Sequence, residues 1–294
     1  MIIIRLQGGL GNQMFQLAFA KSLSVQHHQP LLLDTSLLKT IGSNQPDFTV
    51  RSYALDIFQH GLEIATESRV KRYLNYPFYK KCLKFLRLPY PKAFFEDPKG
   101  SPGQLNNISF PVILEGYWQS EAYFHQHAEL IREMFSFRQS EMAEVETIAS
   151  EIARENAVAI HVRRGDYVTN PAAKEVLGTL EMSYYTRSID KILQMVNNPV
   201  FYVFSDEQDW VKSNFLPHVE YRLIEKSPQY QDYYDLFLMS RCKHNIIANS
   251  SFSWWAGWLN SNPNKIVIAP HRWFKADQLH RYATGLIPGS WHSL

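Results

Sequence analysis

The sequence predicts an α/β protein made of two domains, each built on a parallel sheet. Its 294 residues are long for one hydrophobic core and sufficient for two. The C-terminal half alternates short apolar runs with helical segments, the pattern of a doubly wound sheet. The N-terminal half opens with a strand, a glycine-rich turn and a helix. We place the boundary near Asn156, which gives domains 1–155 and 156–294.

The bulk composition is that of a folded enzyme. Hydrophobic residues make up 45% of the chain and aromatic residues 14%, which excludes a disordered protein and favours clefts that stack on sugars or bases. A net charge of +2 is too small to indicate nucleic-acid binding. Cys82 and Cys242 form neither a disulfide framework nor a metal-ligand spacing. Because no apolar run has the length of a signal peptide or a membrane span, we expect a cytoplasmic protein.

The first domain begins with a predicted strand at 2–6, a turn at 7–16 and a helix at 17–27, followed by a strand at 30–34. Gly8, Gly9 and Gly11 allow the backbone of the turn to approach a ligand, and a helix N-terminus behind them favours an anion. The spacing matches neither a P-loop nor a dinucleotide fingerprint. A tight connection without a ligand is an equally good interpretation.

Residues 69–92 are the most basic stretch, with eight Lys or Arg and no acidic residue. Their apolar residues recur at mixed helical spacing around Pro77, which predicts two amphipathic helical pieces. Such a stretch can contact an anionic membrane, or it can be a solvated face beside a cleft.

A further strand is predicted at 110–115 and runs into Glu115-Gly-Tyr-Trp-Gln119, side chains that could bind a polyhydroxyl acceptor. Helices are predicted at 120–135 and 141–154. In the second half, strands are predicted at 157–161, 200–204, 244–248 and 265–269, and helices at 183–196, 207–215, 230–240 and 252–261.

The strand at 157–161 ends in a charged loop that holds His161, Arg163, Arg164 and Asp166. Strand ends are where ligands bind in open α/β sheets. Two adjacent guanidiniums require carboxylate or phosphate partners, and Asp166 can hold one of them. Alternation along the strand places His161 and Arg163 on one side and Arg164 on the other, so we expect Arg163 to face the ligand. Alternatively, Arg164 and Asp166 form a structural ion pair.

Two more polar clusters follow strands. The first is Ser205-Asp206-Glu207, in which the Asp206 carboxylate could accept two N–H donors from guanine or could cap the next helix. The second is Asn249-Ser250-Ser251-Phe252-Ser253, which lies where a strand passes into a helix. Its side chains and the free amides of the helix form a predicted anion site, with Ser250 or Ser251 as a simple N-cap being the alternative.

Together these clusters resemble the α-1,2-fucosyltransferases of glycosyltransferase family 11, and more distantly the α-1,6- and protein O-fucosyltransferases. The resemblance rests on five segments spread over nearly the whole chain: Gly8-Gly-Leu-Gly-Asn-Gln-Met-Phe-Gln16, Glu115-Gly-Tyr-Trp-Gln119, His161-Val-Arg-Arg-Gly-Asp166, Phe204-Ser-Asp-Glu207 and Asn249-Ser-Ser-Phe-Ser-Trp-Trp255. It implies a GT-B type fold of two Rossmann-like domains facing a cleft. It also implies GDP-β-L-fucose as donor, inversion at the anomeric carbon, and no metal or other cofactor.

The resemblance also implies roles for individual residues. Arg163 would contact the β-phosphate, His161 and Asp206 the guanosine, and Ser251 and Ser253 the diphosphate. Asn12 would lie near the reacting centre. The full set of expected donor-binding residues is His161, Arg164, Asp166, Ser205, Asp206, Asn249, Ser250, Ser251, Ser253 and Gly11.

The general base is not implied by the resemblance, and Glu115 and Asp34 are the candidates at strand ends. The expected acceptor is a galactose-terminated oligosaccharide, such as lactose or a lipid-linked glycan, fucosylated at the 2-hydroxyl. A peripheral contact of residues 69–92 with the inner face of the membrane is a hypothesis from charge. The alternatives are a fucosyltransferase of other linkage, transfer from another GDP-sugar, or a non-catalytic glycan- or nucleotide-sugar-binding protein.

Overall fold

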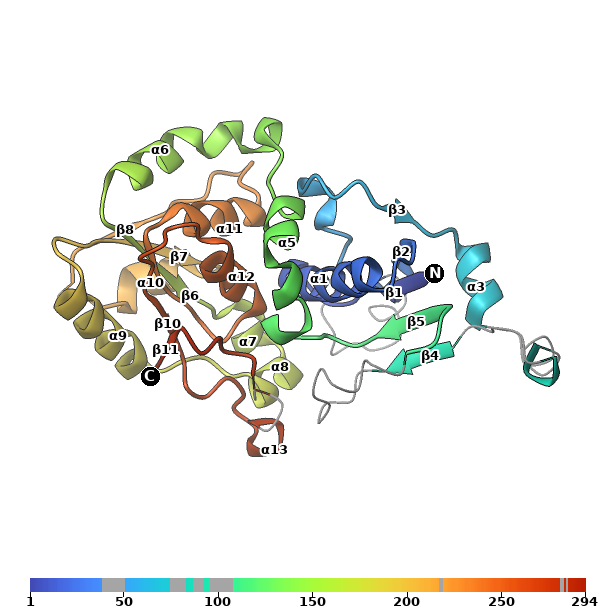
Figure 1. The fold of residues 1–294 in the computed structure, drawn as a ribbon. Helices are drawn as coiled ribbons and strands as arrows, with labels where there is room; N and C mark the ends of the chain where they lie inside the picture. The colour runs from blue at the N-terminus through green and yellow to red at the C-terminus, as the bar shows by residue number, and fades with distance from the viewer. Residues whose placement is uncertain are drawn as a thin grey trace. The chain divides into compact units, whose positions relative to one another are not determined.

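The computed structural model describes residues 1–38, 51–74, 83–86, 92–95, 108–216, 219–280, 283 and 285–294. Within these ranges the chain forms two compact units, Met1–Ser136 and Phe137–Leu294. Each unit contains one parallel sheet with helices around it (Figure 1). The predicted α/β architecture is therefore confirmed.

The N-terminal unit is built on a five-stranded sheet in the order β3-β2-β1-β5-β4, and every neighbouring pair is parallel. Chain order reverses between the central strands β1 and β5, so their carboxyl ends flank a topological switch point. The strands are β1 (Ile2–Arg5), β2 (Leu31–Asp34), β3 (Glu63–Ile64), β4 (Lys92–Phe95) and β5 (Val112–Glu115).

Helix α1 (Leu10–Gln26) is the longest helix of this unit, and it begins seven residues before the predicted start at residue 17. The correction has a physical cause, because two glutamines of the supposed turn are fully buried inside the helix. Gln13 donates to the carbonyls of Gly8 and Ser52, and Gln16 donates to the carbonyls of Gln7 and Gly116. These glutamines hydrogen-bond neighbouring loops although they lie within a helix. Because polar residues next to glycines are typical of turns, the sequence predicted a turn here.

Shorter helical segments complete the N-terminal unit. The predicted continuous helix at 120–135 is wrong, because Phe124 leaves helical geometry to bury its ring near Phe15. The segments are η1 (Leu55–Ile57), α3 (Glu67–Leu74), η3 (Glu121–Tyr123), η4 (His125–His127) and α5 (Ala128–Met134). Only α3 and the short stretch at 83–86 represent the predicted helices of the basic segment, and most of that segment lies outside the described residues.

The C-terminal unit contains a six-stranded parallel sheet in the order β11-β10-β9-β6-β7-β8. The chain adds β7 and β8 on one side of β6 and then returns to add β9, β10 and β11 on the other, the order of a dinucleotide-binding fold. Its switch point lies between β6 and β9. The strands are β6 (Ala157–Val162), β7 (Val200–Ser205), β8 (Tyr221–Leu223), β9 (His244–Ile246), β10 (Val267–Ala269) and β11 (His292–Ser293).

Helices cover both faces of this sheet (Figure 1). Alternate strand residues such as Val158, Ile160 and Val203 pack with Tyr185 and Ile189 in one buried cluster. On the other face, α12 packs on β9 and α11 packs on α12. The helices are α6 (Glu146–Arg154), α7 (Gly165–Thr169), α8 (Pro171–Val176), α9 (Met182–Met195), α10 (Gln208–Asn214), α11 (Asp232–Arg241), α12 (Ser251–Leu259) and α13 (Asp277–His280).

The four predicted strands of this half are confirmed, whereas the short edge strands β8 and β11 were not predicted. Likewise, helices α7 and α8 were not predicted, and α7 begins inside the predicted charged loop. The predicted helix at 141–154 divides into η5 (Gln139–Val145) and α6. Both segments pack on α11, and Phe137 packs edge-on against Phe237, so the structural division precedes Phe137 instead of residue 156.

No helix among the described residues is both long and apolar enough to span a membrane.

Lys265 stabilises the C-terminal end of α12. Its Nζ donates to the carbonyls of Gly257 at 2.8 Å, Trp258 at 3.1 Å and Asn260 at 2.8 Å. Substituting Lys265→Met keeps the aliphatic stem but leaves these carbonyls without their cation. We expect the free energy of unfolding to fall by about 1–3 kcal/mol, as measured by tryptophan fluorescence in urea.

The matched control is Lys212→Met, which removes an exposed ammonium paired only with Glu225 among the ion pairs described. We expect this change to cost less than about 1 kcal/mol. Equal losses in the two variants would show that Lys265 does not cap α12.

Candidate active site

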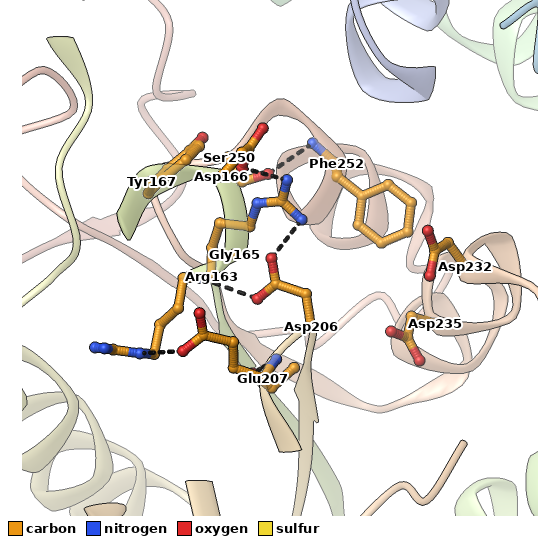
Figure 2. A network of polar contacts seen from close by, with 12 residues as sticks. Arg163, Gly165, Asp166, Tyr167, Asp206, Glu207, Asp232, Asp235, Ser250 and Phe252 are labelled. Atoms are coloured by element: carbon orange, nitrogen blue, oxygen red, sulfur yellow. Dashed lines mark hydrogen bonds and ion pairs between the residues drawn. The ribbon is translucent and has the colours of Figure 1, made fainter. Parts of the chain in front are cut away.

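The charged and hydroxyl clusters of the C-terminal unit meet at the carboxyl edge of its sheet. Arg163 and Arg164 follow β6, Asp206 follows the neighbouring strand β7, and Ser250 follows β9 on the other side of β6. Figure 2 shows Asp206 and Ser250, together with Asp166, close to the Arg163 guanidinium. The site therefore lies at the topological switch point, where open α/β sheets bind ligands.

Arg163 lies between two carboxylates. Its Nη2 is 2.6 Å from Asp166 Oδ1 and its Nη1 is 2.8 Å from Asp206 Oδ2. Burial lowers the pKa of Arg163, but Asp206, Asp166 and Tyr167 together raise it by more, so the guanidinium stays charged. The side chain remains 23% exposed. Because these carboxylates occupy only two of the five N–H donors, the rest of the fork can bind an anion.

Arg164 points away from Arg163, as the alternation along the strand predicts. Its Nε is 2.9 Å from Glu207 Oε2, and its guanidinium lies 3.8 Å from the centre of the Trp210 ring. The alternative ion pair between Arg164 and Asp166 is wrong, since Asp166 binds Arg163 instead. Arg164 thus attaches the loop to α10, and its predicted contact with the donor stays a prediction.

Asp206 uses both carboxylate oxygens within this loop. Oδ2 binds Arg163, and Oδ1 accepts the backbone N–H of Arg164 at 2.9 Å. No side-chain hydrogen bond caps α10, so the alternative of Asp206 as its N-cap is wrong. Ser205 is fully buried and its Oγ accepts the backbone N–H of Glu207 at 3.0 Å. The predicted guanosine contact of Asp206 stays a prediction.

His161 is buried near the same site, on the face of β6 that α12 covers. It is 4% exposed, and its Nδ1 has no hydrogen-bond partner within the structure. Its ring lies 6.0 Å from that of Phe252. Burial, reinforced by Arg163 and Lys226, lowers the pKa of His161 to about 3. The imidazole is therefore neutral and can offer an unused ring nitrogen to a ligand.

The hydroxyl cluster forms the start of α12. Ser250 is its N-cap, and the Ser250 Oγ accepts the backbone N–H of Phe252 at 3.3 Å. Ser253 is fully buried, and its hydroxyl lies 3.4 Å from the Ser250 carbonyl. Ser251 opens the helix and is only partly buried. The N-cap interpretation is thus confirmed for Ser250, and Ser251 is the cluster hydroxyl with most access to solvent.

Asn249 holds neighbouring loops together. Its Nδ2 lies within 3.2 Å of the carbonyls of Leu177, Gly178 and Trp273, and it can donate to two of them at once. The backbone carbonyl of Asn249 accepts the Tyr167 hydroxyl at 3.1 Å. Because its side chain is buried in this network, Asn249 organises the site from within the protein.

A second charged group lies nearby and was not singled out from the sequence. Lys226 Nζ is 2.8 Å from Asp235 Oδ2 and 3.5 Å from Asp232 Oδ1, and the Tyr230 hydroxyl donates to Asp235 at 2.7 Å. Burial raises the pKa of Asp235, although Lys226 opposes that shift. Figure 2 places Asp232 and Asp235 beyond Phe252 from Arg163. The three-residue spacing of the acids at a predicted helix start could have revealed them.

The carboxyl edge of the N-terminal sheet carries the candidates for acceptor chemistry. Arg5, at the end of β1, binds Asp34 at 3.1 Å and Glu115 at 2.7 Å. The Asp34 side chain is 2% exposed and that of Glu115 is 30% exposed, so of the two only Glu115 can reach a dissolved substrate.

Asn12 lies in the first turn of α1, and its Oδ1 accepts from Gln119 Nε2 at 2.8 Å. Gly8 has φ +76°, and a Cβ there would lie 2.5 Å from Asn12 Nδ2, so this turn requires glycine. Gly11 is buried in the same helical turn, not in an open loop.

The parts of the chain that the structure describes contain no group of three or more His, Cys, Asp or Glu that could hold a metal ion.

The fold and the arginine site at its switch point suit a protein that binds an anionic ligand, and comparison with known families identifies it as a glycosyltransferase. The chain belongs to glycosyl transferase family 11, whose family model matches residues 103–288.

Its relatives among characterised proteins include two from Escherichia coli. It is 33% identical to an α-1,2-colitosyltransferase, covering 96% of this chain and 95% of that protein, and 33% identical to the O-antigen biosynthesis glycosyltransferase WbnK, covering 92% and 93%. It is also 26% identical to a galactoside 2-α-L-fucosyltransferase of Caenorhabditis elegans over 90% of this chain and 71% of that protein.

Solved structures confirm the GT-B type fold. Fucosyltransferase NodZ from Bradyrhizobium is similar with a TM-score of 0.51 at 17% identity, covering 87% of this chain and 91% of that one. FUT1 of Arabidopsis thaliana in complex with GDP is similar with a TM-score of 0.53 at 13% identity, covering 94% and 72%.

The buried neutral His161 makes stability depend on pH. In the folded protein its pKa is about 3, whereas an unfolded chain protonates histidine near pH 6.5. The free energy of unfolding should therefore fall as pH drops from 6.5 toward 3, because only the unfolded state gains this proton. We expect His161→Gln to flatten the dependence by at most about 1.4 kcal/mol per pH unit, measured by urea unfolding between pH 7 and 4.

The control is His271→Gln, at an exposed histidine of the same unit, which should leave the slope close to that of the wild type. Parallel curves for the wild type and His161→Gln would contradict a neutral buried imidazole.

Proposed function

We propose that this family 11 enzyme transfers L-fucose from GDP-β-L-fucose to the 2-hydroxyl of a terminal β-galactose, with inversion and without a metal. The observation that carries the proposal is Arg163, a charged guanidinium fixed at the switch point with three N–H donors left for an anion. The names of relatives support the sugar and the linkage, since they include α-1,2-transferases and a galactoside 2-α-L-fucosyltransferase. The α-1,6-fucosyltransferase NodZ has a similar fold, and one of its crystal structures was obtained after soaking with GDP-fucose.

The proposed chemistry separates the fucose C1–O bond, and negative charge then develops on the departing diphosphate. Arg163 and the N-terminus of α12 are fixed cationic and dipolar groups that stabilise this charge as it forms. Asp166 and Asp206 hold Arg163 before reaction, so little reorganisation is needed. These groups can stabilise the negative charge of the departing diphosphate, a role that a divalent cation has in other transferases.

The acceptor hydroxyl must attack C1 from the face opposite the diphosphate and lose its proton. Glu115 is the proposed proton acceptor, because its carboxylate is partly exposed whereas Asp34 is buried. Arg5 binds both, so it fixes the direction of the Glu115 carboxylate. Asn12 and Gln119 would supply amide groups for a sugar hydroxyl nearby.

A second donor is favoured by one observation, the 33% identity to an α-1,2-colitosyltransferase. Colitose is fucose without its 3-hydroxyl. A site that hydrogen-bonds this hydroxyl rejects the deoxy sugar strongly, whereas an apolar site does not. The two donors are therefore distinguished by their relative kcat/KM.

The deciding experiment is a GDP-release assay with GDP-fucose, lactose and EDTA, followed by linkage analysis of the product. An α-1,2-fucosylated product formed in EDTA is the expected result. If only GDP-colitose supports transfer, the proposed donor is wrong. If the sugar is attached to another hydroxyl, the proposed linkage is wrong. Turnover that stops in EDTA and returns with a divalent cation would overturn metal independence.

Lysine substitutions separate the two arginines of the loop. Arg163→Lys keeps a charge between Asp166 and Asp206 but loses the forked donors, so kcat should fall about 10²–10³-fold. Arg164→Lys is the matched control, since Arg164 engages Glu207 and Trp210, and it should change kcat less than about tenfold. Similar losses in both variants would contradict the assignment of the leaving-group role to Arg163.

A peripheral membrane contact is a separate proposal. Within the basic segment, Phe85 is 87% exposed and Leu86 is 60% exposed, beside the exposed Lys84. Apolar tips next to cationic side chains suit an anionic lipid surface. Such a contact would bring the enzyme to a lipid-linked acceptor at the inner face of the membrane.

Flotation with vesicles containing phosphatidylglycerol tests this contact. The protein should float at low salt and dissociate at about 0.5 M NaCl, because screening weakens the attraction. The double substitution Phe85→Ser with Leu86→Ser should abolish flotation without changing turnover of soluble lactose. A wild-type protein that stays at the bottom of the gradient at low salt would refute the contact.

A further inference from the structure

Asp206 is the one carboxylate described here that connects the backbone of the arginine loop with the Arg163 guanidinium. Its Oδ1 accepts the Arg164 N–H at 2.9 Å, and its Oδ2 lies 2.8 Å from Arg163 Nη1. The same carboxylate therefore fixes where the loop begins to turn and where the guanidinium points. Figure 2 shows Asp206 beneath Arg163, with both dashed contacts.

Gly165 supplies an independent observation. A Cβ at this position would lie 2.4 Å from Asp206 Oδ2, closer than real side chains approach. Gly165 opens helix α7 and its backbone does not adopt the left-handed conformation that favours glycine. Conformational freedom is therefore no reason for a glycine here. The Asp206 carboxylate fills the space that a side chain at position 165 would occupy. The glycine therefore allows Asp206 to lie in its observed position.

The second arginine makes this arrangement rigid. Glu207, adjacent to Asp206, binds Arg164, which also stacks on Trp210 of α10. Two consecutive residues of the loop after β6, Arg163 and Arg164, thus bind two consecutive residues of the loop after β7, Asp206 and Glu207. A guanidinium held in this way has lost the rotamer freedom that would oppose anion binding.

Resting on the proposed function, we infer that Asp206 is a positioning residue that aims Arg163 at the donor diphosphate, and that Gly165 makes room for it. In this role Asp206 does not recognise the base. Its removal should therefore weaken interactions with the diphosphate and spare those with the nucleoside. A residue that reads guanine would show the opposite pattern.

The binding experiment uses calorimetry with GDP and with guanosine. Asp206→Asn and Gly165→Ala should each weaken GDP binding about tenfold, because a misaimed fork loses a charge-assisted hydrogen bond. Guanosine, which has no phosphate, should bind both variants as it binds the wild type. Weaker guanosine binding by Asp206→Asn, with the GDP-to-guanosine affinity ratio retained, would overturn the proposal in favour of base recognition.

Combining the two substitutions tests the proposed contact between position 165 and Asp206 directly. In the Asp206→Ala background no carboxylate remains to collide, so Gly165→Ala should cost nothing further. Gly289→Ala is the matched control, because a Cβ there meets no atom within 4 Å. Asp209→Asn, at an exposed acid of α10, controls for loss of charge. Additive losses from Gly165→Ala and Asp206→Ala would overturn the proposed contact.

Turnover separates this inference from the proposed function. If the wild type transfers fucose, Asp206→Asn and Gly165→Ala should lower kcat with the preference for GDP-fucose over ADP-fucose unchanged. If the wild type transfers no fucose from GDP-fucose, the proposed function fails, while the affinities for GDP and guanosine still decide whether Asp206 positions Arg163.

Discussion

The arrangement of the candidate active site depends on the two ion pairs that Arg163 forms with Asp166 and Asp206. A guanidinium that is three-quarters buried requires counter-charges, and here they come from its own loop and from the next strand. Because β6 and β7 are parallel neighbours, their ends present these residues at the same edge. The sheet thus determines the charge arrangement, and the charge arrangement leaves one side of the guanidinium fork available.

On the opposite side of β6, most of the polar groups are hydrogen-bonded within the protein itself. Ser250 caps α12, Asn249 bridges loops, and Ser253 is turned inward. Two buried atoms of this site differ, because His161 Nδ1 and Asn249 Oδ1 have no hydrogen-bond partner among the described residues. In a site where nearly every polar atom is paired, an unpaired ring nitrogen is a natural contact for a bound molecule.

The sequence was most informative where strands end in polar clusters. Periodicity predicts the inner strands, and the polar clusters that follow them include Arg163, Asp206 and Ser250, which the fold brings to one edge of the sheet. It failed where polar residues are buried, as with Gln13 and Gln16 inside α1, because composition does not reveal a tertiary hydrogen bond. It left the partner of Asp166 open, and the alternative pairing with Arg164 is wrong, since the partner of a guanidinium depends on how the loop folds. The Lys226 and Asp235 pair was also missed, although the spacing of Asp232 and Asp235 at a predicted helix start was a signal for it.

The lengths of the outer strands have a consequence for solubility. Three edges of the two sheets are formed by β3, β8 and β11, which contain two, three and two residues. Such short edges offer few unpaired backbone groups to another chain, whereas the apolar central strands would be effective templates for aggregation if exposed. Short outer strands thus protect these three edges from joining the same edge of another molecule.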